Sequence, residues 1–358
     1  VGDVIPLGFT KSGKKLAKLI AKQGQNVSID RLLWAENGDF VTATLSVDAQ
    51  SYSYHIFDLN LGTDTKISDF YFKTKHTDAL VPTETVQITA RDGMKLNALL
   101  LRPKGVDGAA PMVLEVHGGP AGQVKWEYHH FRQFLVNRGY AVLAVNFRGS
   151  SGLGKIYQAA GYGEYGRKMQ DDLVDATLWA IDQGIADPNA IAINGSSYGG
   201  YASAMGLVRD PDLFKAGIIE HAMLDVAYQS QYPPHSWGLY LGQWERYFGD
   251  INSPGDMEKM HQRSPINLVA QMQAAALMVA GKRDPVVGFE QTERFITKAK
   301  DLGKNIDSLI FENEGHGIDK WQSKIRHARR VEDFLAEHLG GRSGNWDWIE
   351  PIAAYLDK

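Results

Sequence analysis

The sequence predicts an α/β protein with a doubly wound, mostly parallel sheet, preceded by a small antiparallel β segment. Apolar runs over 111–116 and 140–145 are typical of strands that a parallel sheet buries on both faces. A segment with helical spacing, 131–137, lies between them, and the alternation of strand and helix continues along the chain. Before about residue 84 the pattern differs, because short alternating strands are joined directly by turns.

The N-terminal segment, which we place at residues 1–80, alternates apolar and polar residues from about Leu32 to Ile67. Asn37-Gly38 and Leu61-Gly62 stand at turn positions, so the pattern indicates hairpins. The stretch 37–59 is similar to one blade of a β-propeller, and an ordinary antiparallel cap has the same signature. The pattern alone leaves both interpretations open.

The second unit, which we place at residues 81–342, begins with a hairpin over 85–101 and continues as alternating elements. The stretch 222–269 is rich in aromatic residues and proline, so we expect an excursion over the carboxyl edge of the sheet. Residues 343–358 are treated as a tail. The other predicted elements are helices over 169–181, 201–208 and 290–302, strands over 190–193, 216–219, 274–280 and 308–311, and a last helix whose core stripe is Trp321, Ile325, Ala328, Val331, Phe334 and Leu335.

Composition excludes several classes of protein and site. The 38 basic and 42 acidic residues give a net charge of −4 without a basic run, so we expect neither nucleic acid nor a membrane surface as a partner. No apolar stretch approaches the ~20 residues of a membrane span. The absence of cysteine excludes disulfides, thiolate nucleophiles and cysteine-bound metals. We expect a cytoplasmic protein, although a periplasmic or secreted one and a homo-oligomer fit the same composition.

The candidate nucleophile is Ser197, in the run Gly195-Ser196-Ser197-Tyr198-Gly199. This run follows a predicted strand and precedes a predicted helix, which is the strand-turn-helix setting of the nucleophile elbow in α/β-hydrolases. The glycines leave room for a sharp turn, and the first amides of the helix supply partial positive charge beside the serine. A tight turn with an N-capping serine is the alternative interpretation.

A serine hydroxyl needs a histidine to take its proton and a carboxylate to orient that histidine, in the chain order Ser, acid, His on this fold. Asp284 follows the predicted strand over 274–280, and His316 follows the one over 308–311, so both stand at carboxyl ends of strands. Asp307 precedes its strand and Asp319 opens a helix. The other histidines that we considered do not follow the last strand; they are His221, His235, His261, His327 and His338.

Upstream, His117-Gly118-Gly119-Pro120 follows the predicted strand over 111–116. This architecture places a backbone N–H there, which would form a two-donor oxyanion hole together with the N–H of Tyr198. A plain Gly-Gly turn is the alternative.

Two glycine-rich runs are similar to nucleotide-binding motifs. The run 149–156 is one residue from a phosphate-binding loop, but Ile156 occupies the position where Mg²⁺ needs a hydroxyl. The run 161–166 has the letters of a dinucleotide fingerprint without a buried strand leading into it. No histidine pair with ligand spacing beside a carboxylate is recognisable either, so we expect no metal and no cofactor.

These motifs together resemble the prolyl oligopeptidase family of serine peptidases, in its acylaminoacyl-peptidase and dipeptidyl-aminopeptidase branch. The resemblance runs from about Thr85 to Leu339, and it implies an α/β-hydrolase fold with Ser197, Asp284 and His316 as triad and the N–H groups of Tyr198 and Gly119 as oxyanion donors. It also favours a propeller remnant for residues 1–80. Besides the runs quoted above it is carried by 146–152, 171–173, 197–201, 281–284 and 315–317.

The expected function is hydrolysis of short or N-acylated peptides, of small carboxylic esters, or of both, through an acyl-serine intermediate. A carboxylesterase with little peptidase activity and a non-catalytic binding module on a hydrolase fold are the alternatives. Tyr232, Trp237 and Tyr240 of the excursion either line an apolar substrate pocket or are buried contacts of the cap. The preference between amides and esters and the mode of cleavage stay open.

Overall fold

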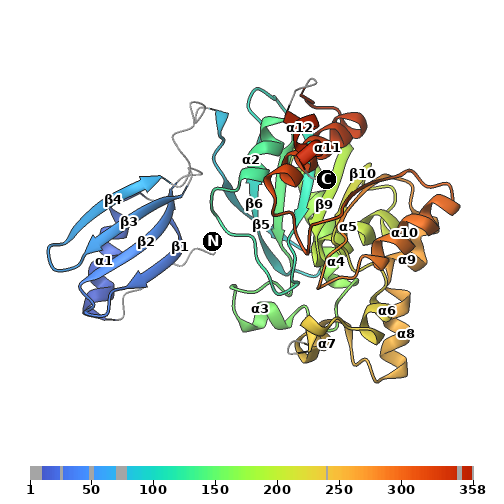
Figure 1. The fold of residues 1–358 in the computed structure, drawn as a ribbon, viewed down its shortest axis with the longest axis horizontal. Coiled ribbons are helices and arrows are strands. Elements are labelled where there is room, and N and C mark those ends of the chain that lie inside the picture. Colours follow the sequence, from blue (N-terminus) through green and yellow to red (C-terminus); the bar gives the residue numbers. More distant parts are fainter. Residues whose placement is uncertain are drawn as a thin grey trace.

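The computed structural model describes residues 10–24, 27–47, 52–69, 79–238, 241–344 and 349–356. Two β-sheets organise this part of the chain: a four-stranded sheet near the N-terminus and an eight-stranded sheet surrounded by helices (Figure 1). No helix in these ranges is long and apolar enough to cross a bilayer.

The N-terminal sheet is an antiparallel meander in the order β1-β2-β3-β4, with the strand number of one propeller blade. Its helix α1 was not predicted, because its apolar face is only Leu16, Leu19 and Ile20, which pack on the inner residues of β2 and β3. The helix begins after Thr10, whose hydroxyl accepts a hydrogen bond from Gly13 N at 3.0 Å. The bounds are α1 Lys11–Ala21, β1 Val27–Trp34, β2 Phe40–Val47, β3 Ser53–Asp58 and β4 Thr63–Asp69.

The eight-stranded sheet has the order β12-β11-β10-β9-β7-β8-β6-β5. β6 is antiparallel to both of its neighbours, β5 and β8, and all other adjacent strands are parallel, as the apolar runs predict. The prediction of a doubly wound, mostly parallel sheet is confirmed. The bounds are β5 Glu84–Thr89, β6 Lys95–Leu101, β7 Ala110–Val116, β8 Ala141–Asn146, β9 Ala186–Ser196, β10 Ala216–Glu220, β11 Ala275–Gly281 and β12 Ile306–Phe311.

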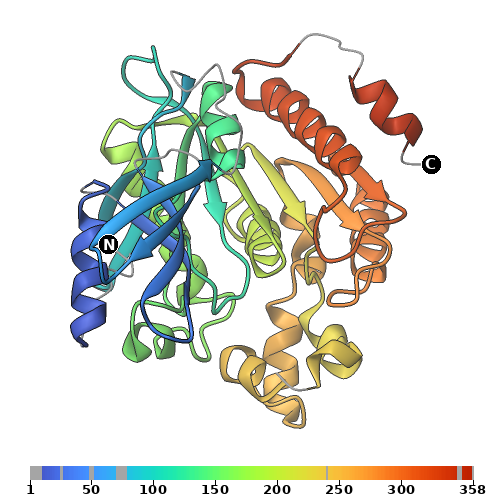
Figure 2. The same ribbon diagram turned by 60° about the vertical axis from the view of Figure 1, so that its left-hand side comes forward.

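Helices cover both faces of this sheet (Figures 1 and 2). One face packs on α2 and α11, and the other on α4, α5 and α10. The predicted core stripe of α11 is wrong at Trp321, which is 51% exposed, because this first residue of the helix lies outside the core that Val331, Phe334 and Leu335 form. The bounds are α2 His130–Asn137, α4 Lys168–Asp182, α5 Tyr198–Arg209, α10 Glu290–Asp301, α11 Trp321–Leu339 and α12 Ile349–Leu356, which packs on α11.

The predicted excursion is a group of short helices at one end of the sheet, in yellow and light orange in Figure 2. In Figure 1 it lies at the same end of the molecule as α3, Lys155–Ala159. Its helices were not predicted individually, because each is too short to show a periodic pattern. They are α6 Val226–Gln231, η2 His235–Trp237, α7 Leu241–Phe248, α8 Pro254–Gln262 and α9 Pro265–Leu268.

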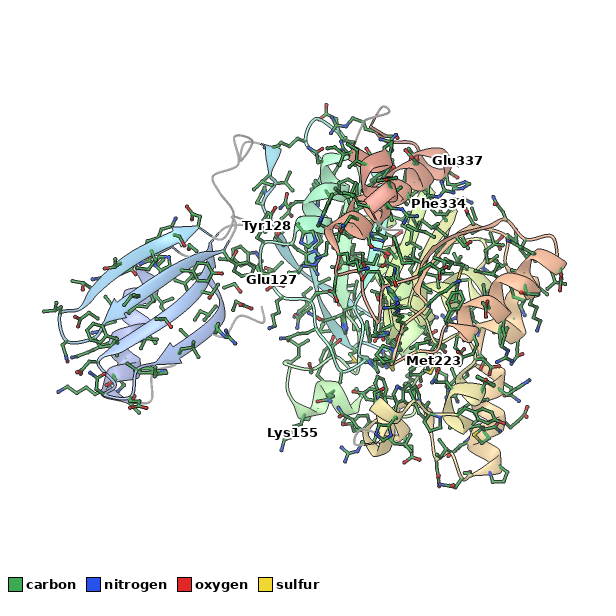
Figure 3. All side chains as sticks on the ribbon, in the orientation of Figure 1. Glu127, Tyr128, Lys155, Met223, Phe334 and Glu337 are labelled. Carbon is green, nitrogen blue, oxygen red and sulfur yellow. The ribbon has the colours of Figure 1, made fainter. Side chains whose placement is uncertain are left out.

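The two sheets are connected by polar contacts from the loop before α2. The Tyr52 hydroxyl donates to Glu127 Oε2 at 2.7 Å, and the amide of Tyr128 donates to Ser46 Oγ at 3.2 Å. Figure 3 shows Glu127 and Tyr128 on the side of the eight-stranded sheet and its helices that faces the N-terminal sheet. The loop that carries Gly119 near its start therefore ends against the N-terminal sheet.

Candidate active site

Ser197 occupies a strained turn between β9 and α5. Its φ of +61° is a left-handed conformation that residues other than glycine rarely adopt. A Cβ on Gly199 would collide with the carbonyl oxygen of Val116, so the second glycine of the motif is needed for close packing of α5 on β7. The amide of Ser197 donates to the carbonyl of Glu220 at 2.9 Å, which ties the turn to β10.

Asp284 and His316 meet in the structure although they follow different strands. Asp284 lies in the loop after β11 and His316 in the loop after β12, and His316 Nδ1 is 2.7 Å from Asp284 Oδ2. The other carboxylate oxygen accepts from the amides of Val286 and Val287 at 2.8 and 2.9 Å. The Asp284 side chain is only 2% exposed and that of His316 is 21% exposed, so the imidazole stands between the acid and solvent.

The surroundings of Asp284 favour its ionised form. Burial acts to raise its pKa, but the contacts with His221 and His316 and the hydrogen bond from Val287 N–H outweigh burial and hold the pKa of Asp284 well below its usual range. The carboxylate is therefore charged at neutral pH and accepts the Nδ1 proton of His316. Nε2 of His316 is then the nitrogen with a free lone pair.

Ser197 and Asp284 follow strands that are separated by a single strand of the sheet. β10 lies between β9 and β11, so the ends of the three strands are adjacent. Among the hydrogen bonds of the described residues, none joins the hydroxyl of Ser197 to His316. Such contacts are often long without substrate and shorten when it binds.

Gly119 lies in a loop that passes directly beside Ser197. A Cβ added to the preceding Gly118 would lie 3.5 Å from Ser197 Cβ. Gly119 itself has φ +131°, and a Cβ there would collide with the amides of Ala121 and Gly122. The Tyr198 amide belongs to the first turn of α5, where backbone N–H groups lack acceptors inside the helix. Both predicted oxyanion donors thus border the same turn.

The ring of His117 holds this loop in place. It stacks on Phe147 with ring centroids 4.3 Å apart, and its Nε2 and Nδ1 lie 2.8 Å from Ser150 Oγ and from the carbonyl oxygen of Gly118. Burial lowers the pKa of His117 to about 4, so the ring is neutral at pH 7. The run at 146–151 therefore positions the loop that carries Gly119.

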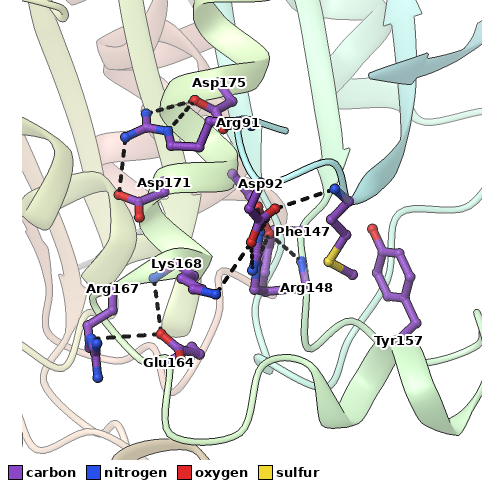
Figure 4. A network of polar contacts seen from close by, with 12 residues as sticks. Arg91, Asp92, Phe147, Arg148, Tyr157, Glu164, Arg167, Lys168, Asp171 and Asp175 are labelled. Atoms are coloured by element: carbon purple, nitrogen blue, oxygen red, sulfur yellow. Dashed lines mark hydrogen bonds and ion pairs between the residues drawn. The ribbon is translucent and has the colours of Figure 1, made fainter. Parts of the chain in front are cut away.

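Arg148 anchors that run to the body of the protein (Figure 4). Its guanidinium donates to Asp172 of α4 at 2.6 and 2.8 Å and to Asp92 of the β5-β6 hairpin at 2.7 and 3.0 Å. Its backbone amide also donates to Asp172, at 2.8 Å. The two motifs at 146–152 and 171–173 are therefore joined by the buried ion pair between Arg148 and Asp172.

A cavity of about 490 Å³ opens beside the loop that carries Gly119. Trp237 is buried in its wall, donates from Nε1 to the carbonyl of Val286 at 3.1 Å, and stacks on Trp244 with centroids 5.2 Å apart. Tyr232 is 66% exposed and not among the lining residues, and Tyr240 lies outside the described residues. The lining is Gly119, Pro120, Ala121, Gly122, Ser236, Trp237, Gln243, Trp244, Tyr247 and Val286.

His221 is the residue near the triad that sequence reasoning rejected. It follows β10, and its Nδ1 lies 3.7 Å from Asp284 Oδ2 with the side chain 1% exposed. Its ring is 5.8 Å from that of His316, so the structure brings together beside Asp284 two histidines that no sequence spacing paired. His221 does not follow the last strand, but it follows β10, which is adjacent to β11 in the sheet. That position was the available signal.

Comparison with known proteins finds a family model, relatives and solved structures that match much of the chain. The profile described as the prolyl oligopeptidase family matches residues 126–342. Dipeptidyl aminopeptidase BIII of Pseudoxanthomonas mexicana is 35% identical over 300 residues, which are 81% of this chain and 43% of that protein. The chain therefore spans less than half the length of this relative.

Solved structures give the same result. The puromycin-hydrolyzing peptidase of Mycobacterium tuberculosis has a TM-score of 0.79 and 26% identity, over 87% of this chain and 47% of that one. The acylaminoacyl peptidase of Pyrococcus horikoshii has a TM-score of 0.77 over 92% of this chain and 52% of that one; at 22% identity this similarity concerns the fold alone. The resemblance expected from the motifs is confirmed, and the chain belongs to the prolyl oligopeptidase family of serine peptidases.

Proposed function

We propose that the chain hydrolyses short or N-acylated peptides and small acyl esters through an acyl intermediate on Ser197. The observation that carries the proposal is the 2.7 Å contact between His316 Nδ1 and Asp284 Oδ2, beside a serine held at a left-handed turn. Nε2 of His316 takes the proton of the Ser197 hydroxyl as the oxygen attacks the carbonyl carbon. Asp284 stabilises the imidazolium that forms.

The oxyanion is stabilised by two backbone N–H groups, those of Tyr198 and Gly119. The amide of Tyr198 is fixed at the start of a helix, whose dipole favours negative charge. Gly119 is fixed by its own crowded loop and by the ring of His117. His316 then returns its proton to the leaving amine or alcohol, and water, deprotonated by the same imidazole, releases the acid.

The substrate group next to the scissile bond is apolar. The cavity beside Gly119 has aromatic walls from Trp237, Trp244 and Tyr247, and Val286 adds a further apolar side chain. The cavity borders the loop that carries Gly119 and is lined mostly by apolar side chains, so it suits the acyl or P1 side chain of the substrate. Relatives named as peptidases support amide substrates, and esters follow because their leaving groups need less protonation.

The test compares one acyl group on two leaving groups, as an acyl-peptide anilide and as a p-nitrophenyl ester. Ser197→Ala should reduce kcat for both by as much as about 10⁶-fold and abolish labelling by a fluorophosphonate. Ser196→Ala, at the neighbouring serine of the same motif, is the matched control and should be labelled normally. Undiminished turnover by Ser197→Ala would refute the proposal, whereas activity on the ester alone would restrict it to an esterase.

A further inference from the structure

His221 is a buried imidazole without a hydrogen-bond partner. Neither its Nδ1 nor its Nε2 has a partner among the described residues, and the side chain is 1% exposed. Leaving a polar group buried without a hydrogen bond is unfavourable. Its φ of +46° adds strain for a residue that is not glycine. Such a side chain points to a ligand.

The nearest polar groups to His221 belong to the candidate triad. Its Nδ1 lies 3.7 Å from Asp284 Oδ2, and one ligand atom from each of His221, Asp284 and His316 can be chosen so that all three lie within 4.8 Å of one another. Glu220, in the preceding position and paired with His327 at 3.2 Å, adds a second carboxylate to the surroundings of His221. One nitrogen of each imidazole and one carboxylate oxygen therefore lie close enough together to share an ion.

We propose that His221, Asp284 and His316 form a binding site for a divalent transition-metal ion, Zn²⁺ in particular, whose binding blocks hydrolysis. Zn²⁺ prefers nitrogen and carboxylate ligands at about 2.0–2.2 Å, which separates the ligand atoms of a tetrahedral site by about 3.3 Å. The contacts of 2.7 and 3.7 Å that Asp284 Oδ2 makes with the two imidazoles bracket this separation, and all three ligand atoms lie within 4.8 Å of one another. Mg²⁺ and Ca²⁺ are poor candidates, because they select oxygen ligands.

The blocked state follows from the protons of His316. Without metal, the single proton of the neutral ring is on Nδ1 and Nε2 is the base. When Zn²⁺ takes the lone pair of Nδ1, that proton passes through solvent to Nε2, which then cannot accept the proton of Ser197. Access is from the His316 side, which is 21% exposed, and water completes the coordination.

Direct binding tests the site independently of catalysis. Ser197→Ala protein, titrated with Zn²⁺ against a chromophoric chelator, should bind one ion per chain at this site. Adding His221→Asn should weaken that binding by roughly 100-fold, while His261→Asn at an exposed histidine of α8 should not change it. Asparagine tolerates left-handed backbone, and thermal unfolding verifies that the variant is folded. Equal affinity with and without His221 would overturn the proposal.

Inhibition tests the consequence, which rests on the proposed role of His316. Zn²⁺ should inhibit ester hydrolysis by the unmodified chain, EDTA should restore it, and His221→Asn should need roughly 100-fold more Zn²⁺ for the same fractional inhibition. Binding without inhibition would overturn the blocked state. If the unmodified chain has no hydrolase activity, the proposed function fails, while the titration of Ser197→Ala still decides the metal site.

Discussion

His316 Nδ1 lies 2.7 Å from Oδ2 of Asp284, although 32 residues separate them in the chain. The contact forms because parallel strands β11 and β12 are adjacent, so the loops after them leave the sheet at the same edge. Two amides fix the second oxygen of Asp284, which leaves the carboxylate no freedom to turn away. Asp284 therefore determines both the tautomer and the direction of the imidazole.

Asp284→Asn should lower kcat by about 10⁴-fold with little change in KM. The asparagine side chain stabilises neither the correct tautomer of His316 nor its imidazolium form. Steady-state kinetics on a p-nitrophenyl ester measure this. Asp307→Asn, on β12 but away from His316, is the control and should keep the normal kcat. An Asp284→Asn enzyme within tenfold of the normal kcat would show that another group orients His316.

Gly119→Ala should lower kcat by about 10²–10³-fold, since the added Cβ displaces the loop amide from the oxyanion. The control is Gly105→Ala. Gly105 also has positive φ, at +71°, but a Cβ there meets nothing within 4 Å, so only a small loss of stability is expected. Comparing kcat for the two variants separates displacement of the loop from backbone strain alone. Equal kcat values for the two variants would show that the Gly119 amide does not stabilise the oxyanion.

The sequence was sufficient to predict where each candidate catalytic residue lies along the sheet, but it was not sufficient to predict the detailed shape of the site. Ser197, Asp284 and His316 each follow a buried strand, and the carboxyl ends of parallel strands share one edge, so their proximity could be derived from the order of elements. The role of His221 could have been found by the same reasoning, applied to every strand end. Its orientation toward Asp284 depends on a left-handed backbone that no sequence pattern announces.

The residues that line the cavity could not be identified from the sequence. Aromatic enrichment over 222–269 indicated an apolar surface, yet it could not tell lining residues from exposed ones. Trp237 lines the cavity while Tyr232, five positions earlier, is 66% exposed. The difference arises from short helices whose directions depend on contacts with distant loops, such as that of Trp237 with Val286.

Trp237→Ala should raise KM about tenfold or more for substrates with a large apolar acyl group and leave KM for small acetyl esters nearly unchanged. The substitution removes part of the aromatic wall that only a large acyl group contacts. KM and kcat for a series of acyl chain lengths measure this. Tyr232→Ala is the control from the same excursion, and it should change neither constant. A uniform loss across the series would instead indicate that the excursion has become disordered.

Arg148→Ala should lower the free energy of unfolding by about 3–5 kcal/mol, because Asp172, whose side chain is 0% exposed, keeps a buried charge without its partner. Denaturant unfolding at neutral pH measures the loss. Arg102→Ala breaks an ion pair with Glu84 that is about half exposed and should cost no more than about 1 kcal/mol. Similar losses for both variants would contradict a structural role for the Arg148 network.

Acid should destabilise the fold through His117. Burial lowers its pKa to about 4, against about 6.5 in the unfolded chain. Between these values the unfolded state binds more protons, so the stabilisation is complete above about pH 6.5 and is lost as the pH falls toward 4. His117 alone should account for about 2 kcal/mol of the stability lost between pH 7 and pH 4.5.

The readout is the difference in unfolding free energy between these two pH values, from denaturant titrations. His117→Gln loses the stacking on Phe147 at both pH values, so it is less stable throughout. Its loss on acidification should nevertheless be about 2 kcal/mol smaller than that of the unmodified chain. The stability that this variant still loses on acidification includes the contribution of His129, whose pKa burial also lowers to about 4. His261→Gln, at an exposed histidine, should reproduce the unmodified pH dependence, and an identical dependence for His117→Gln would mean that His117 is not the titrating group.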